Sequence, residues 1–207
     1  ILNNLPIAFN NDLGFITASP SNLGTGMRAS VMLFLPACVL LNKLEELIVS
    51  ANENGLTFRG IYGEGSRGIG YFYQVSNQAS LGMDENEIID KVSEFIYSIC
   101  QKEKELRDYI LEKERDVYKD KALRAYGILT NCYMLEEEEM IELLSQIKLG
   151  QVLGFLDIKN DDKFQKLYFE GMHANLKEIF EFSDEKKENI IRASYISNKV
   201  RQLTKEV

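Results

Sequence analysis

The uneven distribution of glycine and proline is the feature that most limits what this 207-residue chain can fold into. Ten of the fourteen glycines and all three prolines lie within residues 1–82. Both residue types are poor helix formers and favour the turns that join strands. We therefore predict that the first part contains a sheet and that the later residues form helices.

Four segments of the first part are rich in β-branched and aromatic residues and are bounded by Gly, Pro or Asn. We predict strands at residues 14–19, 29–36, 56–61 and 70–77. In the intervening segment of residues 37–55, apolar residues recur at helical spacing, which predicts a helix that ends at Gly55. The first part is thus an α+β unit.

The second part has the apolar spacing of helices almost throughout. A long helix is expected to open at Asp84, with Glu87 three residues later as the partner in a capping box. Further helices are predicted at residues 121–132, 136–150, 161–180 and 184–205. We place the join between the two parts near Arg107, which gives domains of residues 1–107 and 108–207.

Charge and composition exclude several classes of protein. The formal net charge of −8 disfavours a nucleic-acid partner, since phosphate backbones attract clustered Lys and Arg. The longest apolar run, residues 31–41, contains a proline and is shorter than the roughly 20 residues of a membrane-spanning helix. The three cysteines lack metal-site spacing, so we expect buried free thiols and a cytoplasmic protein.

Two arginines stand out in a part of the chain that holds few other charges. If each of the two segments is a strand, alternation of side chains places one set of residues on a common face of each strand. These sets are Arg28, Ser30, Met32 and Phe34 on one strand and Thr57, Arg59 and Ile61 on the other. A guanidinium at a strand end beside a glycine-rich turn is a good receptor for phosphate. The alternative is a structural arginine that pairs with a nearby carboxylate such as Glu64.

Residues 59–71 read RGIYGEGSRGIGY and hold a second glycine cluster. The cluster matches neither the dinucleotide-binding fingerprint nor a P-loop. It is either a flexible connection between strands or a mobile loop that brings Glu64 and Ser66 to a substrate. The single histidine, His173, lacks metal-ligand spacing and is not predicted to be catalytic. The acidic residues 136–139 are expected to be solvated at a helix start.

The segment of residues 19–36 reads SPSNLGTGMRASVMLFLP and resembles the CPTNLGTGLRASV segment of ATP:guanido phosphotransferases. Residues 59–82 (RGIYGEGSRGIGYFYQVSNQASLG) and 124–129 (RAYGIL) resemble the branch that phosphorylates arginine side chains of proteins. The small-metabolite kinases usually carry a second arginine where this chain has Tyr62. The resemblance therefore favours the bacterial protein-arginine kinase branch.

The resemblance implies an antiparallel sheet with flanking helices, similar to glutamine synthetase, followed by an all-helical dimerisation domain. It implies ATP and Mg²⁺ as cofactors and Arg28, Arg59 and Glu64 as catalytic residues, with no residue assigned to the metal. The residues implied to contact the nucleotide are Arg28, Ala29, Ser30, Val31, Met32, Arg59, Gly60, Ile61, Tyr62, Gly63 and Glu64.

The implied function is ATP-dependent phosphorylation of exposed arginines in cytoplasmic proteins that are then passed to a Clp protease. A homodimer is expected, without nucleic-acid or membrane partners. Two alternatives stay open. One is a catalytically silent homologue that acts as a binding or scaffold module. The other is a kinase of a small guanidino metabolite.

The sequence departs from the family pattern at three places. The family's S-x-R-x-R and NEEDH segments lie upstream of residue 1, so we expect little catalysis from these 207 residues alone. The family's reactive cysteine falls at Ser19, which is not a thiolate at neutral pH. The branch's R-D-x-x-R-A motif, a docking site for phosphoarginine, falls on ENIIRA at residues 188–193. Glu188 in place of arginine is expected to repel a phosphoryl group.

Overall fold

The computed structural model describes residues 7–60 and 68–206, which fall into two compact units. The first unit comprises the residues up to 68 together with 72–106. The second comprises 69–71 and 107–207.

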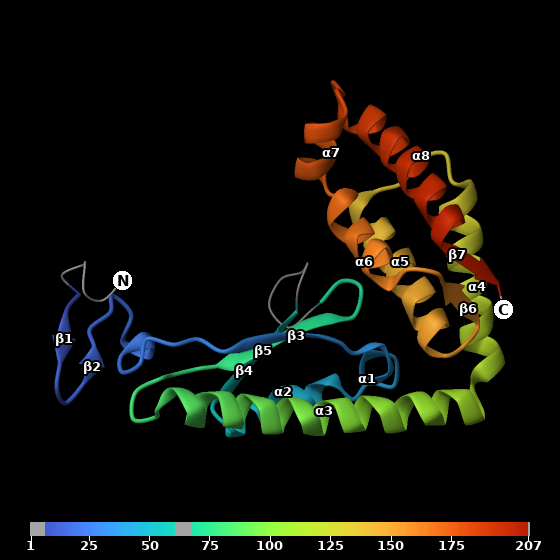
Figure 1. The fold of residues 1–207 in the computed structure, drawn as a ribbon. Helices are drawn as coiled ribbons and strands as arrows, with labels where there is room; N and C mark the ends of the chain where they lie inside the picture. Colours follow the sequence, from blue (N-terminus) through green and yellow to red (C-terminus); the bar gives the residue numbers. More distant parts are fainter. Residues whose placement is uncertain (1–6, 61–67, 207) are drawn as a thin grey trace. The chain divides into compact units, whose positions relative to one another are not determined.

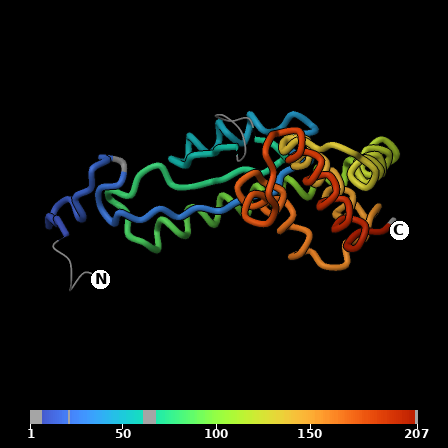
Figure 2. The backbone as a smooth tube through the Cα atoms, turned by 90° about the horizontal axis from the view of Figure 1, so that it is seen from above, coloured from blue at the N-terminus to red at the C-terminus, as the bar shows by residue number. Residues whose placement is uncertain are grey.

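A three-stranded antiparallel sheet forms the centre of the first unit (Figure 1). Its middle strand is β5 (Phe72–Asn77), with β3 (Ser30–Phe34) on one side and β4 (Leu56–Gly60) on the other. Val75 lies opposite both Val31 of β3 and a residue of β4 in the register. Figure 2 shows the backbones of β3 and β5 running beside each other when the sheet is viewed from above. The strands predicted in these three segments are confirmed, with shorter bounds.

One face of this sheet packs against helices α1 (Pro36–Leu40), α2 (Leu44–Glu53) and α3 (Glu85–Lys113). The buried side chains of this core come from alternate strand positions and from the apolar sides of the helices. They include Leu33, Leu35, Leu56, Phe58, Tyr73, Val75, Ala51, Val92 and Ile99. The opposite face of the sheet is not part of this core.

The start of α3 confirms the predicted capping box. The Asp84 backbone N–H donates to Glu87 Oε2 at 2.8 Å, and the Glu87 N–H donates to Asp84 Oδ1 at 2.9 Å. The prediction of a single helix within residues 37–55 is wrong, because the structure has two helices there. Asn42 adopts a left-handed φ of 55° and separates α1 from α2.

The predicted strand at residues 14–19 is much shorter in the structure. Only β2 (Gly14–Phe15) is extended, and it pairs with β1 (Phe9–Asn10). A 3-10 turn follows at Pro20–Asn22. Because β1 offers two residues for pairing, the ladder cannot continue along the segment.

Five helices make up most of the second unit (Figure 1). They are α4 (Arg115–Asn131), α5 (Glu137–Val152), α6 (Asp161–Glu170), α7 (His173–Ile179) and α8 (Glu185–Leu203). The helix predicted over residues 161–180 is two helices, interrupted at Gly171. A Cβ added there would lie 2.0 Å from Met140 Sδ, so glycine permits a close contact with α5 at this break.

The prediction that the second part is all-helical is wrong. Strand β6 (Leu156–Ile158) pairs antiparallel with β7 (Thr204–Glu206). Three-residue strands give too short a pattern to be recognised, and these two lie far apart in the sequence. Their pairing depends on the path that the helices give to the chain.

The cysteines do not all follow the prediction of burial. Cys38 is buried in the core of the first unit, whereas Cys100 is exposed and Cys132 is half-buried. Cys100 follows the buried Ile99 directly and so falls outside the apolar side of α3. In the part of the chain that the structure describes, no helix is long and apolar enough to cross a membrane.

Candidate functional site

The face of the sheet opposite the helices carries both polar and apolar side chains. The polar ones are Ser30 from β3, Thr57 and Arg59 from β4, and Gln74 and Ser76 from β5, and the apolar ones are Met32, Phe34 and Phe72. In the register, Gln74 lies opposite both Met32 and Arg59, while Ser76 lies opposite both Ser30 and Thr57. Alternation predicted that every second residue from Arg28 to Phe34 shares one face, as do Thr57 and Arg59. The observed register places these alternate strand residues on the open face.

Arg28 and Arg59 reach the open face from opposite edges of the sheet. Arg28 Nη2 donates a hydrogen bond of 3.2 Å to Ser76 Oγ, and Ser76 is 1% exposed. Arg59 lies opposite Gln74, which precedes Ser76 by two residues on β5. The two arginines therefore meet β5 at positions about 7 Å apart along the strand. Both arginines are exposed, and neither forms an ion pair with any described carboxylate. Their two charges are therefore available to an anion.

The side chain of Asn77 fixes the backbone on both sides of Arg28. Its Oδ1 accepts a hydrogen bond of 2.8 Å from the Ala29 N–H. Its Nδ2 donates to the carbonyl oxygens of Met27 at 3.0 Å and Ala79 at 3.1 Å. These three bonds set the position from which Arg28 extends over β5.

We expect Asn77→Ala to lower the free energy of unfolding by about 1–3 kcal/mol, because the Ala29 N–H and the Met27 carbonyl lose their partner. Urea denaturation of the chain measures this change. Asn86→Ala is the matched control, since Asn86 is an exposed residue in the first turns of α3. Equal stability of the two variants would contradict the role given to Asn77.

The glycines of the NLGTG segment allow a close approach between two parts of the first unit. Gly24 has a φ of +98°, and a Cβ added to it would lie 2.6 Å from the Ser80 carbonyl oxygen. The buried Ser80 donates from Oγ to the Leu23 carbonyl at 2.8 Å. Only glycine fits at position 24, so this segment is held beside Ser80 just before it continues to Arg28.

The glycine-rich segment of residues 59–71 is described only at its two ends. Gly60 is paired with Tyr73 at the end of β4. At the other end, a Cβ on Gly68 would lie 2.8 Å from the Phe72 carbonyl oxygen and 3.0 Å from the Tyr73 ring. Burial raises the pKa of the Tyr73 hydroxyl, while a backbone hydrogen bond at Gly68 acts in the opposite direction.

The structure thus brings together only some of the predicted site residues. Arg28, Ser30, Met32 and Arg59 share the open face, and Ala29 is bound to Asn77. Val31 alternates to the other face, although its position at an edge leaves it 41% exposed. The remaining predicted residues, Ile61, Tyr62, Gly63 and Glu64, lie outside the described residues, as does Ser66. The predicted pairing of an arginine with Glu64 lies there too.

Three polar residues around this site were missed by the sequence reasoning: Ser76, Asn77 and Glu103. The Glu103 carboxylate is 3% exposed and accepts from the N–H groups of Ala37 and Cys38, at 3.0 and 2.9 Å, just beyond β3. Glu103 falls four residues after Ile99 on the apolar side of α3. An acidic residue at such a position is a signal of a buried polar contact.

Comparison with known proteins identifies the family of this chain. Residues 1–106 match the family model described as ATP:guanido phosphotransferase, C-terminal catalytic domain. The chain belongs to the ATP:guanido phosphotransferase family. Residues 115–207 match the model described as protein-arginine kinase McsB C-terminal domain. The resemblance inferred from the NLGTG and glycine-rich motifs is confirmed.

Curated relatives of this family cover both units. The protein-arginine kinase of Clostridium acetobutylicum is 37% identical over 199 residues, which are 96% of this chain and 58% of that protein. That of Bacillus subtilis is 40% identical over 149 residues, 72% of this chain and 41% of that protein. The chain therefore spans about half the length of the relatives it matches. A taurocyamine kinase structure from Schistosoma mansoni is 34% identical, covering 53% of this chain and 15% of that chain, with a TM-score of 0.44.

Proposed function

We propose that this chain supplies part of the ATP site of an enzyme that phosphorylates arginine side chains of proteins. The observation that carries the proposal is the placement of Arg28 and Arg59 on one open sheet face, with neither in an ion pair with a described carboxylate. The relatives named protein-arginine kinase support the choice of substrate. The proposal also includes nucleotide contacts by Ile61, Tyr62, Gly63 and Glu64.

Transfer of a phosphoryl group needs fixed positive charge around the migrating anionic group. Arginine supplies that charge at every physiological pH, and its planar donors match phosphate oxygens in pairs. Arg28 and Arg59 would bind and orient the polyphosphate of ATP, while the exposed Ser30 hydroxyl of the same face offers a neutral hydrogen-bond partner. Glu64 would position the loop or the substrate guanidinium.

We propose magnesium only as an ion bound to the phosphates of the nucleotide. It neutralises charge by bridging phosphate oxygens. Among the described residues, no three His, Cys, Asp or Glu side chains form a group that could hold a metal ion. The open face offers cations and hydroxyls, which suit the phosphates and not the metal. We therefore assign no residue of this chain as a metal ligand.

The wider assignment follows the two units. We propose that residues 1–107 are the C-terminal part of a catalytic domain, with its sheet belonging to a larger glutamine-synthetase-like sheet. Residues 108–207 would form a dimerisation and regulatory domain. The two compact units and the two matching family models support this division. A cytoplasmic homodimer that passes its products to a Clp protease completes the proposal.

We expect Arg28→Ala in the full-length protein to weaken the binding of Mg-ADP about tenfold, since one charge-assisted contact to phosphate is lost. Isothermal titration measures the dissociation constant. Lys43→Ala is the control, because it removes a cation of the same unit that pairs with Glu46. Unchanged affinity in Arg28→Ala would overturn the proposed site.

The substrate is tested separately, by incubating the full-length protein with ATP and either an arginine-rich protein or free arginine. Phosphoarginine on the protein is the expected result. Activity on free arginine alone would indicate a small-metabolite kinase. Mg-ADP binding without either product would indicate a silent homologue, for which Ser19 in place of the family's cysteine is the motivating feature.

A further inference from the structure

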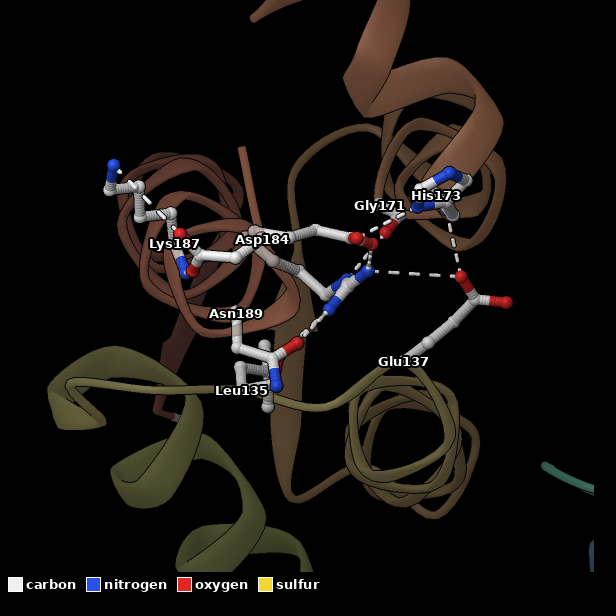
Figure 3. Close-up of polar contacts among 9 residues, drawn as sticks. Leu135, Glu137, Gly171, His173, Asp184, Lys187 and Asn189 are labelled. Carbon is white, nitrogen blue, oxygen red and sulfur yellow. Dashed lines mark hydrogen bonds and ion pairs between the residues drawn. The ribbon is translucent and has the colours of Figure 1, made fainter. Parts of the chain in front are cut away.

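The second unit contains a cavity of about 570 Å³ among the starts of α5, α7 and α8. Its lining includes Phe182, His173 and Lys177, the buried Arg192, and a set of carboxylates. Several of these side chains are exposed, so the cavity opens to solvent. Figure 3 shows the polar contacts at its inner end, where side chains from separate helices meet.

Arg192, which lines the cavity, is 2% exposed and already engaged by the protein. Its Nε donates to the Gly171 carbonyl at 2.7 Å. Its Nη1 donates to the Leu135 carbonyl at 3.0 Å and to Asn189 Oδ1 at 2.6 Å. Its Nη2 donates to the buried carboxylate of Glu188. This guanidinium is therefore neutralised and has few donors to offer an incoming anion.

Carboxylates of the chain also occupy backbone N–H groups that an anion would otherwise bind. Glu137 Oε2 accepts from the His173 N–H at 2.8 Å. Asp184 Oδ1 accepts from the Lys187 N–H at 2.9 Å at the start of α8. Hydrogen bonds from the Lys187 backbone and the Ser183 hydroxyl lower the pKa of Asp184, which keeps it ionised.

The lining as a whole is strongly negative. It holds six carboxylates against two permanent cations, Lys177 and Arg192. The carboxylates are those of Glu136, Glu137, Glu138, Asp184, Glu185 and Glu188. Glu138 and Glu185 are exposed and form no ion pair with any side chain that the structure describes. An anionic ligand would meet repulsion at this mouth, whereas a cation would be attracted.

The side chains that line the cavity favour a guanidinium over other cations. Phe182 is half-buried and packs edge-on against the His173 ring, with centroids 5.8 Å apart. A flat aromatic surface beside carboxylates suits a planar guanidinium, which can stack on a ring and donate hydrogen bonds in its own plane. An ammonium has no flat face to stack.

We propose that this cavity binds the guanidinium of an unphosphorylated arginine side chain of a polypeptide and excludes the phosphorylated form. Glu188 contributes by holding Arg192 internally, and the carboxylates at the mouth attract the cation. The site uses only residues of the second unit, so it does not depend on the proposed nucleotide site. It extends the sequence-based expectation that Glu188 repels a phosphoryl group.

The proposal is tested by titrating the 207-residue chain with four small probes. Acetyl-arginine-amide is expected to bind at least about tenfold more tightly than acetyl-citrulline-amide, its neutral isostere, because charge-assisted hydrogen bonds are lost. Blocked lysine is expected to bind more weakly than blocked arginine, and phosphoarginine not measurably. Tighter binding of phosphoarginine, citrulline or lysine than of arginine would overturn the proposal.

Two variants place the binding in the cavity. The double variant Glu138→Gln/Glu185→Gln is expected to weaken acetyl-arginine-amide binding about fivefold, since two exposed attractions are removed. Glu142→Gln is the matched control, because Glu142 is an exposed residue of α5 outside the lining. If both variants bind arginine as the unaltered chain does, the cavity is not the site. Mg-ADP affinity, measured alongside, reports the nucleotide site independently.

Discussion

Replacing Arg192 by methionine is expected to lower the free energy of unfolding by about 3–5 kcal/mol, because the change leaves a buried carboxylate without its countercharge. Arg192 is 2% exposed, and Glu188 beside it is 7% exposed. The variant also leaves the carbonyl groups of Gly171 and Leu135 without their donor. Methionine fills a similar space, so the loss comes from polar groups and not from a void.

Urea denaturation of the 207-residue chain measures the effect. Lys186→Met is the control, since Lys186 is exposed on the same helix, and its stability is expected to stay within about 0.5 kcal/mol of the unaltered chain. The cost of Arg192→Met is expected to fall when Glu188→Gln is already present, because the uncompensated charge is then absent. An equal cost in both backgrounds would show that the two side chains do not act as a pair.

Replacing Glu103 by glutamine is expected to cost about 2–3 kcal/mol of stability. Both carboxylate oxygens accept hydrogen bonds from buried N–H groups, at Ala37 and Cys38. Glutamine has nearly the same shape, but only one of its two terminal atoms is an acceptor. Its NH₂ group would therefore face one of the two backbone N–H groups, and no hydrogen bond can form there. Since α1 follows β3 directly, this contact also fixes the end of the strand that carries the site residues.

The control for Glu103 lies two residues further along the same helix. Glu105 is exposed and approaches Lys102 only at 4.0 Å, so Glu105→Gln is expected to change stability by less than about 0.5 kcal/mol. Denaturation of both variants under the same conditions gives the comparison. A stable Glu103→Gln variant would mean that water or another side chain replaces the lost acceptor.

Local patterns predicted the features that depend on neighbouring residues alone. Alternation predicted that Arg28 and Arg59 extend to the open side of the sheet, because successive side chains of an extended chain point to opposite sides; the Arg28–Ser76 hydrogen bond and the position of Arg59 opposite Gln74 agree. The Asp84 and Glu87 capping box was also predicted, since both partners lie within one helical turn. The motif likeness predicted the family.

Other features could not be predicted because they depend on contacts between distant segments. At the helix break, Gly171 lies so close to Met140 of α5 that an added Cβ would clash. The β6 and β7 pair joins residues 156–158 to residues 204–206, which the intervening helices bring together. Both Glu64 and Tyr62 lie outside the described residues, so their roles stay predictions.

The sequence by itself determined the family, the strand faces that carry the two arginines, and the charged helical character of the later residues. Only the tertiary structure decided what holds those side chains in place. Asn77 lies 48 residues from Ala29, and Glu103 lies 66 residues from Ala37, yet each pair is joined by a hydrogen bond. The same is true of the cavity, where Glu137, Gly171 and Arg192 meet. Such contacts depend on the path of the whole chain, because no local spacing brings these groups within hydrogen-bond distance.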